Sequence, residues 1–95
     1  MILVKKYRDN YGYVLVLCDK NLYGKKFEEG EFVLELNEFF NGEEKEKIDE
    51  KDFEDIYFIY AVGEESINIL KEKKIIDEKD IKRIAGIPYT FVIYL

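Results

Sequence analysis

Few side chains in this sequence are suited to act as a nucleophile or a general base. The chain has no histidine, and its only cysteine, serine and threonine are Cys18, Ser66 and Thr90. Without an imidazole, proton transfer near pH 7 falls to carboxylates, lysines or tyrosines whose pKa values burial must shift strongly. The composition therefore argues against a catalyst and predicts no cofactor. It also excludes a structural zinc site, which needs several Cys or His ligands.

Three short segments have residue types that could bind a ligand. In residues 18–27 an apolar strand stops and a Gly-Lys pair follows a turn. Residues 62–66 pass from a strand through glycine into a helix N-terminus, where free backbone amides can hold an anion. Residues 85–89 form a tight connection constrained by glycine and proline. The candidate binding residues are Cys18, Asp19, Lys20, Tyr23, Gly24, Lys25, Lys26, Gly63, Glu64, Ser66, Gly86, Pro88 and Tyr89.

Each candidate also has a purely structural interpretation. A cysteine at a strand end is commonly a small buried hydrophobe, so Cys18 is expected in the core. Asp19 suits a turn or a helix cap, and the glycines suit backbone of unusual φ. Lys25 is the strongest functional candidate, although a Gly-Lys pair alone lacks the other glycine and the Ser/Thr of a phosphate-binding loop. Glu64 and Glu65 complement a helix dipole, and their charge argues against an anion at that turn.

Together these segments, in this order and spacing, resemble an archaeal family of small uncharacterised proteins, the DUF424 family, over nearly the whole chain. The matching positions are Cys18, Asp19, Gly24, Lys25, Phe27, Val62, Gly63, Glu64, Gly86 and Pro88. The chain departs from the family at Tyr89, which stands where a histidine follows the proline. Tyr60-Ala61 replaces a segment with a frequent asparagine, and Lys74 replaces a helix-ending glycine. A family activity that needs the histidine would be missing here. Because that family has no established activity, the resemblance implies lineage and compartment more than mechanism.

The charge of the chain limits its partners. It carries 15 basic and 21 acidic side chains, a net charge of −6, and its pI is about 4.7. This balance argues against DNA, because phosphate-backbone binding rewards clustered Lys and Arg. Lys20, Lys25 and Lys26 leave a local basic patch open, with a solvated face as the plainer interpretation. The tyrosines near these lysines suit either stacking on single-stranded RNA or a protein-binding surface, and the acidity favours protein.

Length and hydropathy predict one cytoplasmic domain over residues 1–95. No apolar run approaches the roughly 18 residues of a membrane span, and Lys5 and Lys6 follow the apolar N-terminus too soon for a signal peptide. The single cysteine agrees with a reducing compartment. Abundant Lys and Glu without Gln is typical of proteins from hot environments, and AT-rich genomes favour Lys as well.

The hydrophobic pattern predicts an α+β fold. Strands are expected at 2–4 and 13–17, joined by a turn at 9–12, and then at 32–36 and 56–62. A charged loop at 38–47, a short acidic helix around Phe53, a helix from Glu64 to Lys74 and a turn at Asp77 are expected between them. Residues 81–84 and 91–95 suggest a closing hairpin. The expected sheet is mixed or mainly antiparallel, curled in part toward a barrel, with two or three short helices.

Three functions fit these patterns. The first is a non-catalytic module that binds a protein or a ribonucleoprotein through Lys20, Tyr23, Lys25 and Lys26. The second is a small enzyme or anion-binding protein that uses Asp19 and Lys25 with Cys18 or Ser66. The third is a structural subunit, either a homodimer or a docked chain, which would expose an apolar edge on residues 89–95. None of these readings involves DNA or a membrane.

Overall fold

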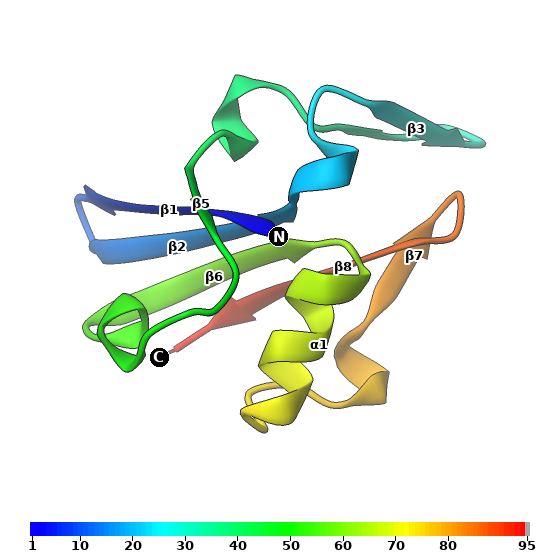
Figure 1. The fold of residues 1–95 in the computed structure, drawn as a ribbon. Helices are drawn as coiled ribbons and strands as arrows, with labels where there is room; N and C mark the ends of the chain where they lie inside the picture. Colours follow the sequence, from blue (N-terminus) through cyan, green and yellow to red (C-terminus); the bar gives the residue numbers. More distant parts are fainter. Residues whose placement is uncertain (95) are drawn as a thin grey trace.

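The computed structural model describes residues 1–94 and has a central six-stranded mixed sheet with spatial order β5-β1-β2-β6-β8-β7 (Figure 1). Its strands are β1 (Ile2–Asp9), β2 (Gly12–Asp19), β5 (Glu43–Lys45), β6 (Ile56–Val62), β7 (Lys82–Ile84) and β8 (Ile87–Ile93). Only β2 and β6 pair in parallel; the other neighbouring strands are antiparallel. The two edges, β5 and β7, do not meet, so the expected curling toward a barrel is wrong.

The predicted opening hairpin is confirmed, and its strands are longer than expected. β1 and β2 pair along their whole length, from Ile2 opposite Asp19 to Asp9 opposite Gly12. The strand predicted at 56–62 is confirmed as β6. It lies beside β2 in the centre of the sheet, as its β-branched and aromatic residues indicate. The closing hairpin is confirmed as β7 and β8, although β8 begins earlier, at Ile87. Residue 95, the end of the predicted strand, lies outside the described residues.

The expectation of two or three helices is wrong. Within residues 1–94 the structure has one α-helix, α1 (Glu64–Glu72). The other helical segments are short 3₁₀ turns: η1 (Lys20–Leu22), η2 (Glu38–Phe40), η3 (Glu50–Phe53) and η4 (Glu78–Asp80). The acidic segment around Phe53 is therefore η3. It has four residues and none of them is buried. Without an apolar face to pack against the core, a longer α-helix is not stabilised here.

Two strands were not expected from the sequence. Lys26–Glu29 forms β3, which pairs with β4 (Phe32–Glu35) in a separate two-stranded hairpin. The strand predicted at 32–36 therefore exists but does not join the main sheet. The predicted charged loop contains β5, which pairs with the start of β1 although its sequence is Glu-Glu-Lys. Pairing with a buried strand overrides the low β-propensity of such residues.

The sheet separates two apolar layers. On one side α1 packs through Ile67 and Leu70 against strand residues that include Leu15, Leu17 and Ile59. On the other side the β3–β4 hairpin and η2 cover Val14, Val16, Cys18 and their neighbours. Figure 1 shows α1 below the sheet and the hairpin above it. The alternation of side chains along β2 sends Cys18 to one layer and Asp19 to the other.

Leu70 tests how strongly α1 is held by the first layer. It is fully buried, so we expect Leu70→Ala to lower the free energy of unfolding by about 3 kcal/mol, the usual cost of a core cavity. Asn68→Ala, on the exposed side of the same helix, is the matched control and is expected to change it by less than about 0.5 kcal/mol. Urea denaturation measures both. Equal losses would contradict the assigned face of α1.

Candidate functional site

The first two candidate segments meet the third at one end of the sheet. β2 and β6 run in parallel, so Asp19, the last residue of β2, and Gly63, which directly follows β6, lie at the same end of the sheet. The amide of Gly63 donates a hydrogen bond of 2.8 Å to the carbonyl of Pro88 on β8. The structure thus brings together three segments that are distant in the sequence, which the sequence patterns did not predict.

Asp19 is the centre of this convergence. Its side chain is 4% exposed and lies at the N-terminus of α1. One carboxylate oxygen accepts hydrogen bonds from the Ser66 amide at 2.8 Å and the Ser66 hydroxyl at 2.9 Å. The other oxygen accepts from the Glu65 amide at 3.0 Å. The helix N-terminus thus binds an anion, as such termini do, and the anion is the carboxylate of this chain.

Gly63 is required by the same arrangement. Its φ is +108°, which is unfavourable for residues with a side chain, and a Cβ atom there would lie 2.2 Å from Cγ of Asp19. The glycine thus lets the carboxylate approach the first turn of α1. Its presence is explained by the cap and not by an external ligand.

Cys18 and Ser66 have structural roles. Cys18 is fully buried in the layer opposite α1, and its thiol contacts the carbonyl oxygen of Asp19 at 3.4 Å. Burial, with a smaller effect of the Asp19 charge, raises the pKa of the Cys18 thiol to about 12. The Ser66 hydroxyl is also buried and is engaged by Asp19. Neither side chain is presented to a substrate in this arrangement.

The predicted basic patch is largely neutralised. Lys20 forms an ion pair with Glu44 at 2.7 Å, and Lys26 forms one with Glu28 at 3.2 Å. Lys25 is exposed and has no ion pair with any residue of 1–94. Tyr23 is half-buried against the layer that contains Cys18, and Gly24 has a φ of +84° with open space around it. The structure therefore leaves Lys25 as the free cation of this patch.

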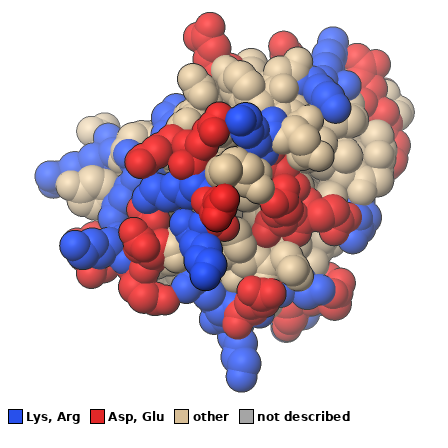
Figure 2. All heavy atoms as spheres, viewed as in Figure 1, with Lys and Arg blue, Asp and Glu red and all other residues tan. Residues whose placement is uncertain are grey.

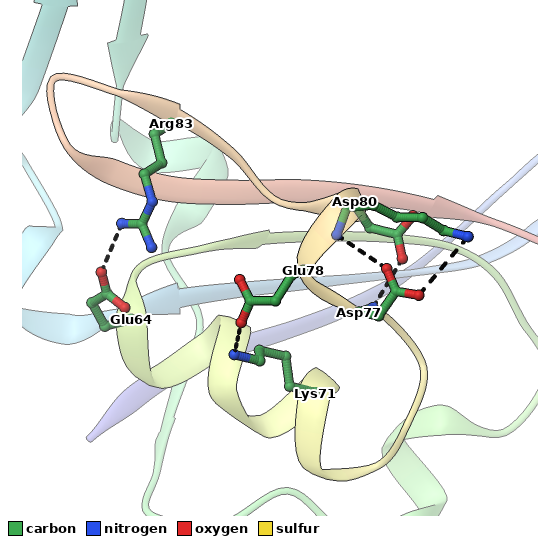
Figure 3. A network of polar contacts seen from close by, with 7 residues as sticks. Glu64, Lys71, Asp77, Glu78, Asp80 and Arg83 are labelled. Carbon is green, nitrogen blue, oxygen red and sulfur yellow. Dashed lines mark hydrogen bonds and ion pairs between the residues drawn. The ribbon is translucent and has the colours of Figure 1, made fainter.

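A polar network ties the third segment to α1 (Figure 3). Arg83 of β7 donates to the carboxylate of Glu64 at 3.0 Å and to the carbonyl of Gly86 at 3.1 Å. Lys71 pairs with Glu78, and this contact lowers the pKa of the Glu78 carboxyl. A groove of about 500 Å³ between α1 and η4 is lined partly by this pair. The network fixes η4 and β7 beside the helix, and its charges largely satisfy one another.

The sequence reasoning missed an aromatic network on the layer opposite α1. The ring-to-ring contacts, with centroids 4.4–6.4 Å apart, join nine aromatic residues into one connected set. The members are Tyr7, Tyr11, Phe39, Phe40, Tyr57, Phe58, Tyr60, Tyr89 and Phe91. Tyr89, the residue that departs from the family pattern, is half-buried within this set and packs against Phe91 at 6.0 Å. The period-2 placement of Phe58 with Tyr60 and of Tyr89 with Phe91 was the available signal.

Part of this network is exposed. Phe39 is 40% exposed, Phe91 49% and the adjoining Ile93 58%. In register, Tyr60 lies opposite Phe91, and Phe58 lies opposite Ile93. We call Phe39, Phe58, Tyr60, Phe91 and Ile93 the aromatic surface.

Two lysines flank the aromatic surface. Lys5 of β1 lies in the same cross-strand row as Tyr60 and Phe91, and its ammonium group is 4.6 Å from the centroid of the Phe39 ring. Lys82 lies opposite Tyr89 and so projects from the same side of the sheet. Neither lysine forms an ion pair within residues 1–94.

Comparisons with known proteins identify relatives but no function. The model of the family "Protein of unknown function (DUF424)" matches residues 7–95. No curated protein matches the chain. A solved structure, "Crystal structure of an uncharacterized conserved protein from Methanopyrus kandleri", is similar with a TM-score of 0.81 and 23% identity, covering 99% of this chain and 93% of that one. At this identity the likeness shows the fold. Within residues 1–94 there is no helix long and apolar enough to cross a membrane and no cluster of three potential metal ligands.

Asp19 provides a test of the helix cap. We expect Asp19→Ala to lower the free energy of unfolding by about 3 kcal/mol, because buried amides lose their acceptor. Asp19→Asn keeps one carbonyl oxygen and should cost less, about 1–2 kcal/mol. The control is Asp77→Ala, which removes an exposed cap of η4 and should cost under about 1 kcal/mol. Urea denaturation distinguishes the three, and a loss at Asp19 no larger than at Asp77 would contradict the cap.

Cys18 provides a test of burial. Because its pKa lies near 12, almost no thiolate forms at pH 8 in the folded protein. We expect the thiol to react with Ellman's reagent at least about a hundredfold more slowly in buffer than in denaturing urea at the same pH. Comparable rates in both solutions would place Cys18 at the surface.

Proposed function

Since the chain belongs to the DUF424 family of proteins of unknown function, we propose that it is a non-catalytic module that binds another protein through the aromatic surface. The observation that carries this proposal is the half-exposure of Phe39, Phe91 and Ile93 at the border of a packed aromatic network. An apolar group of this kind, rather than isolated exposed residues, is typical of an interaction site. The structural neighbour comes from an archaeon, which agrees with an archaeal setting for this chain.

The aromatic surface is rigid, which favours binding. Phe91 is held on β8 against Tyr60 at 4.4 Å between centroids, and Phe39 packs edge-on against Phe40 at 5.2 Å. Rings that are already fixed lose little conformational entropy when a partner covers them. Aromatic residues in such positions supply large contact areas and are frequent among residues that dominate binding energy.

The flanking charges define the partner's chemistry. Lys5 and Lys82 are both positive and lie on either side of the exposed rings. The ammonium group of Lys5 already donates to the carbonyl of Phe39 at 3.1 Å, which orients it beside that ring. A partner that matches this surface presents apolar side chains bordered by Asp or Glu. The net charge of −6 makes such local attraction more selective, because the rest of the chain repels acidic partners.

A protein fits this surface better than RNA. Binding of single-stranded RNA combines free aromatic faces with a basic path for the backbone. Here every exposed ring of the aromatic surface already packs against another ring, and Lys20 and Lys26 are paired with acidic residues. Figure 2 shows basic and acidic side chains interspersed over the visible face, without a continuous basic region.

The alternative of an enzyme or anion-binding protein receives less support. It needs Asp19 with Cys18 or Ser66 in an accessible pocket. The carboxylate of Asp19 accepts hydrogen bonds from the Ser66 amide and hydroxyl at the start of α1, and Cys18 is in the core. Lys25 is free of an ion pair within residues 1–94, so the patch around Lys25 remains a second contact surface to compare with the first.

Site-specific photo-crosslinking tests the proposed partner surface. A photoreactive phenylalanine analogue at position 39 should crosslink one protein in an extract of the source organism, and the same analogue at position 32 should not. Phe32 is 67% exposed at the tip of the β3–β4 hairpin and takes no part in the aromatic surface, so it is the matched control. The crosslinked protein is then purified and titrated with variants. We expect Phe39→Ser to weaken its binding at least about tenfold and Phe32→Ser to leave it unchanged.

Charge variants and nuclease complete the test. Lys5→Glu should weaken binding of the purified partner, and high salt should weaken it as well. All variants must keep the melting temperature of the unaltered chain within a few degrees. Loss of binding only in Lys25→Glu with Lys26→Glu would move the contact to that patch. A crosslink that disappears after nuclease treatment would support the RNA alternative and overturn the protein proposal.

A further inference from the structure

The outer edge of β8 is only partly covered. β7 pairs with β8 from Ile87 to Tyr89, whereas β6 pairs with it from Tyr89 to Ile93. The hydroxyl of Thr90 donates to the carbonyl of Asp80 at 2.7 Å, so η4 covers the edge as far as that residue. Beyond it, the outer side of β8 has no strand partner within residues 1–94.

The hydrogen-bond pattern shows which backbone groups face outward. The amide of Gly63 bonds to Pro88 and the amide of Tyr94 bonds to Tyr57, both at 2.8 Å, which marks the hydrogen-bonded pairs at the two ends of the β6–β8 ladder. Such pairs alternate along an antiparallel ladder, so Thr90 and Val92 bond to β6.

The backbone groups of Phe91 and Ile93 therefore point away from β6. Each residue contributes one amide and one carbonyl to the uncovered edge. No hydrogen bond within residues 1–94 engages these four groups. Such a row is a template for an additional strand.

The edge also lacks the features by which proteins protect exposed strands. The sequence from Ile84 to Tyr94 contains no charged residue, and its only proline, Pro88, is buried in the part that β7 covers. Phe91, Ile93 and Tyr94 are each about half exposed or more. Charges, prolines or bulges at an edge normally prevent pairing between chains, so their absence leaves this short edge open to pairing with another strand.

We propose that this strand is β8 of a second copy, which pairs antiparallel to the first with the two-fold axis at Val92. Phe91 of each copy then lies opposite Ile93 of the other. Each of these two residue pairs exchanges two hydrogen bonds, so the junction has four in total.

The register follows from the outward groups. The outward amides and carbonyls of one copy must face those of the other. Because only alternate residues have outward groups, one strand can shift along the other only in steps of two residues. A register centred on Phe91 would require the groups of Tyr89, which already pair with Lys82. A register centred on Ile93 would pair Phe91 with residue 95 of the other copy, which lies outside the described residues. The register centred on Val92 uses the outward groups of both Phe91 and Ile93 and no others.

The side chains and charges agree with a second copy as the occupant. Phe91 meets Ile93 of the other copy on the aromatic side, and the two Val92 side chains meet on the α1 side. Because the chain has a net charge of −6, two copies repel each other in most orientations. The uncharged edge of β8 allows close approach without opposing like charges. A two-fold contact of this kind is closed, so it produces a dimer and not a fibre.

This inference does not rest on the proposed partner binding, although Phe91 and Ile93 take part in both. Pairing uses the edge of the sheet, whereas the partner would cover its face. A dimer places two aromatic surfaces side by side on one continuous sheet. Phe39 on η2 lies outside the paired strand, so its variants test the partner and not the dimer.

Light scattering and analytical ultracentrifugation of the whole chain test the dimer. From about 1 to 500 µM protein we expect a rise toward twice the 11.4 kDa mass of one chain. Ile93→Pro removes an outward amide without touching the β6–β8 ladder, and Ile93→Ala is the control that keeps the amide. We expect the proline variant to raise the dimer dissociation constant at least about tenfold over the alanine variant. A monomer throughout, or equal effects of the two variants, would overturn the proposal.

Disulfide trapping tests the register in the folded protein. In this register residue 92 of one copy lies opposite residue 92 of the other, at a non-hydrogen-bonded position. The Cα atoms of such a pair are about 4.5 Å apart, within the range that a disulfide spans. With oxidised glutathione as the oxidant, the Val92→Cys variant should form a covalent dimer. Tyr94→Cys, whose position faces Thr90 of the other copy, should not. Buried Cys18 is not expected to interfere. Equal crosslinking at both positions, or none at 92, would overturn this register.

Discussion

The carboxylate of Asp19 at the start of α1 is the interaction on which the arrangement of the domain depends. It satisfies two backbone amides and the Ser66 hydroxyl in a site almost closed to solvent. The same contact requires glycine at position 63 and holds the end of β2 against the end of β6. Gly63 in turn bonds to Pro88, which connects β8. A single buried anion thus orients the helix and aligns three strands at one end of the sheet, because unpaired polar groups there would be costly.

This cap uses side chains that could otherwise support chemistry. Asp19 and Ser66 have their hydrogen-bonding capacity taken up by the cap, and the adjacent Cys18 is forced into the opposite core by strand alternation. The reactive residue types of this chain are therefore concentrated where they stabilise the fold. Among the exposed residues, which are largely charged, Phe39, Phe91 and Ile93 form an apolar group. This apolar group is the basis of the proposed partner binding.

The two sides of the sheet differ in how completely they are covered. On the α1 side the helix and the segments around it bury Ile59 and Ala61 fully. On the opposite side η2 contacts β2 and the β3–β4 hairpin contacts β7, and the rings toward the end of β8 remain partly open. β7 is also too short to cover β8. The open face and the open edge therefore meet at Phe91 and Ile93, which links partner binding and dimerisation to the same corner of the molecule.

Local patterns in the sequence determined much of the fold. The opening hairpin, the buried strand at 56–62 and the helix that follows Gly63 could be predicted because hydrophobic period and turn residues act between near neighbours. β3 and β5 could not, because strands rich in Glu and Lys are stabilised by the segments they contact. The sequence also marked Asp19, Gly63 and Pro88 as special. The tertiary structure was needed to show that Asp19 caps α1 beside Gly63, that Pro88 accepts a hydrogen bond from Gly63, and that nine aromatic residues from separate segments form one network. Such contacts depend on strand order and register, which bring together residues far apart in the chain.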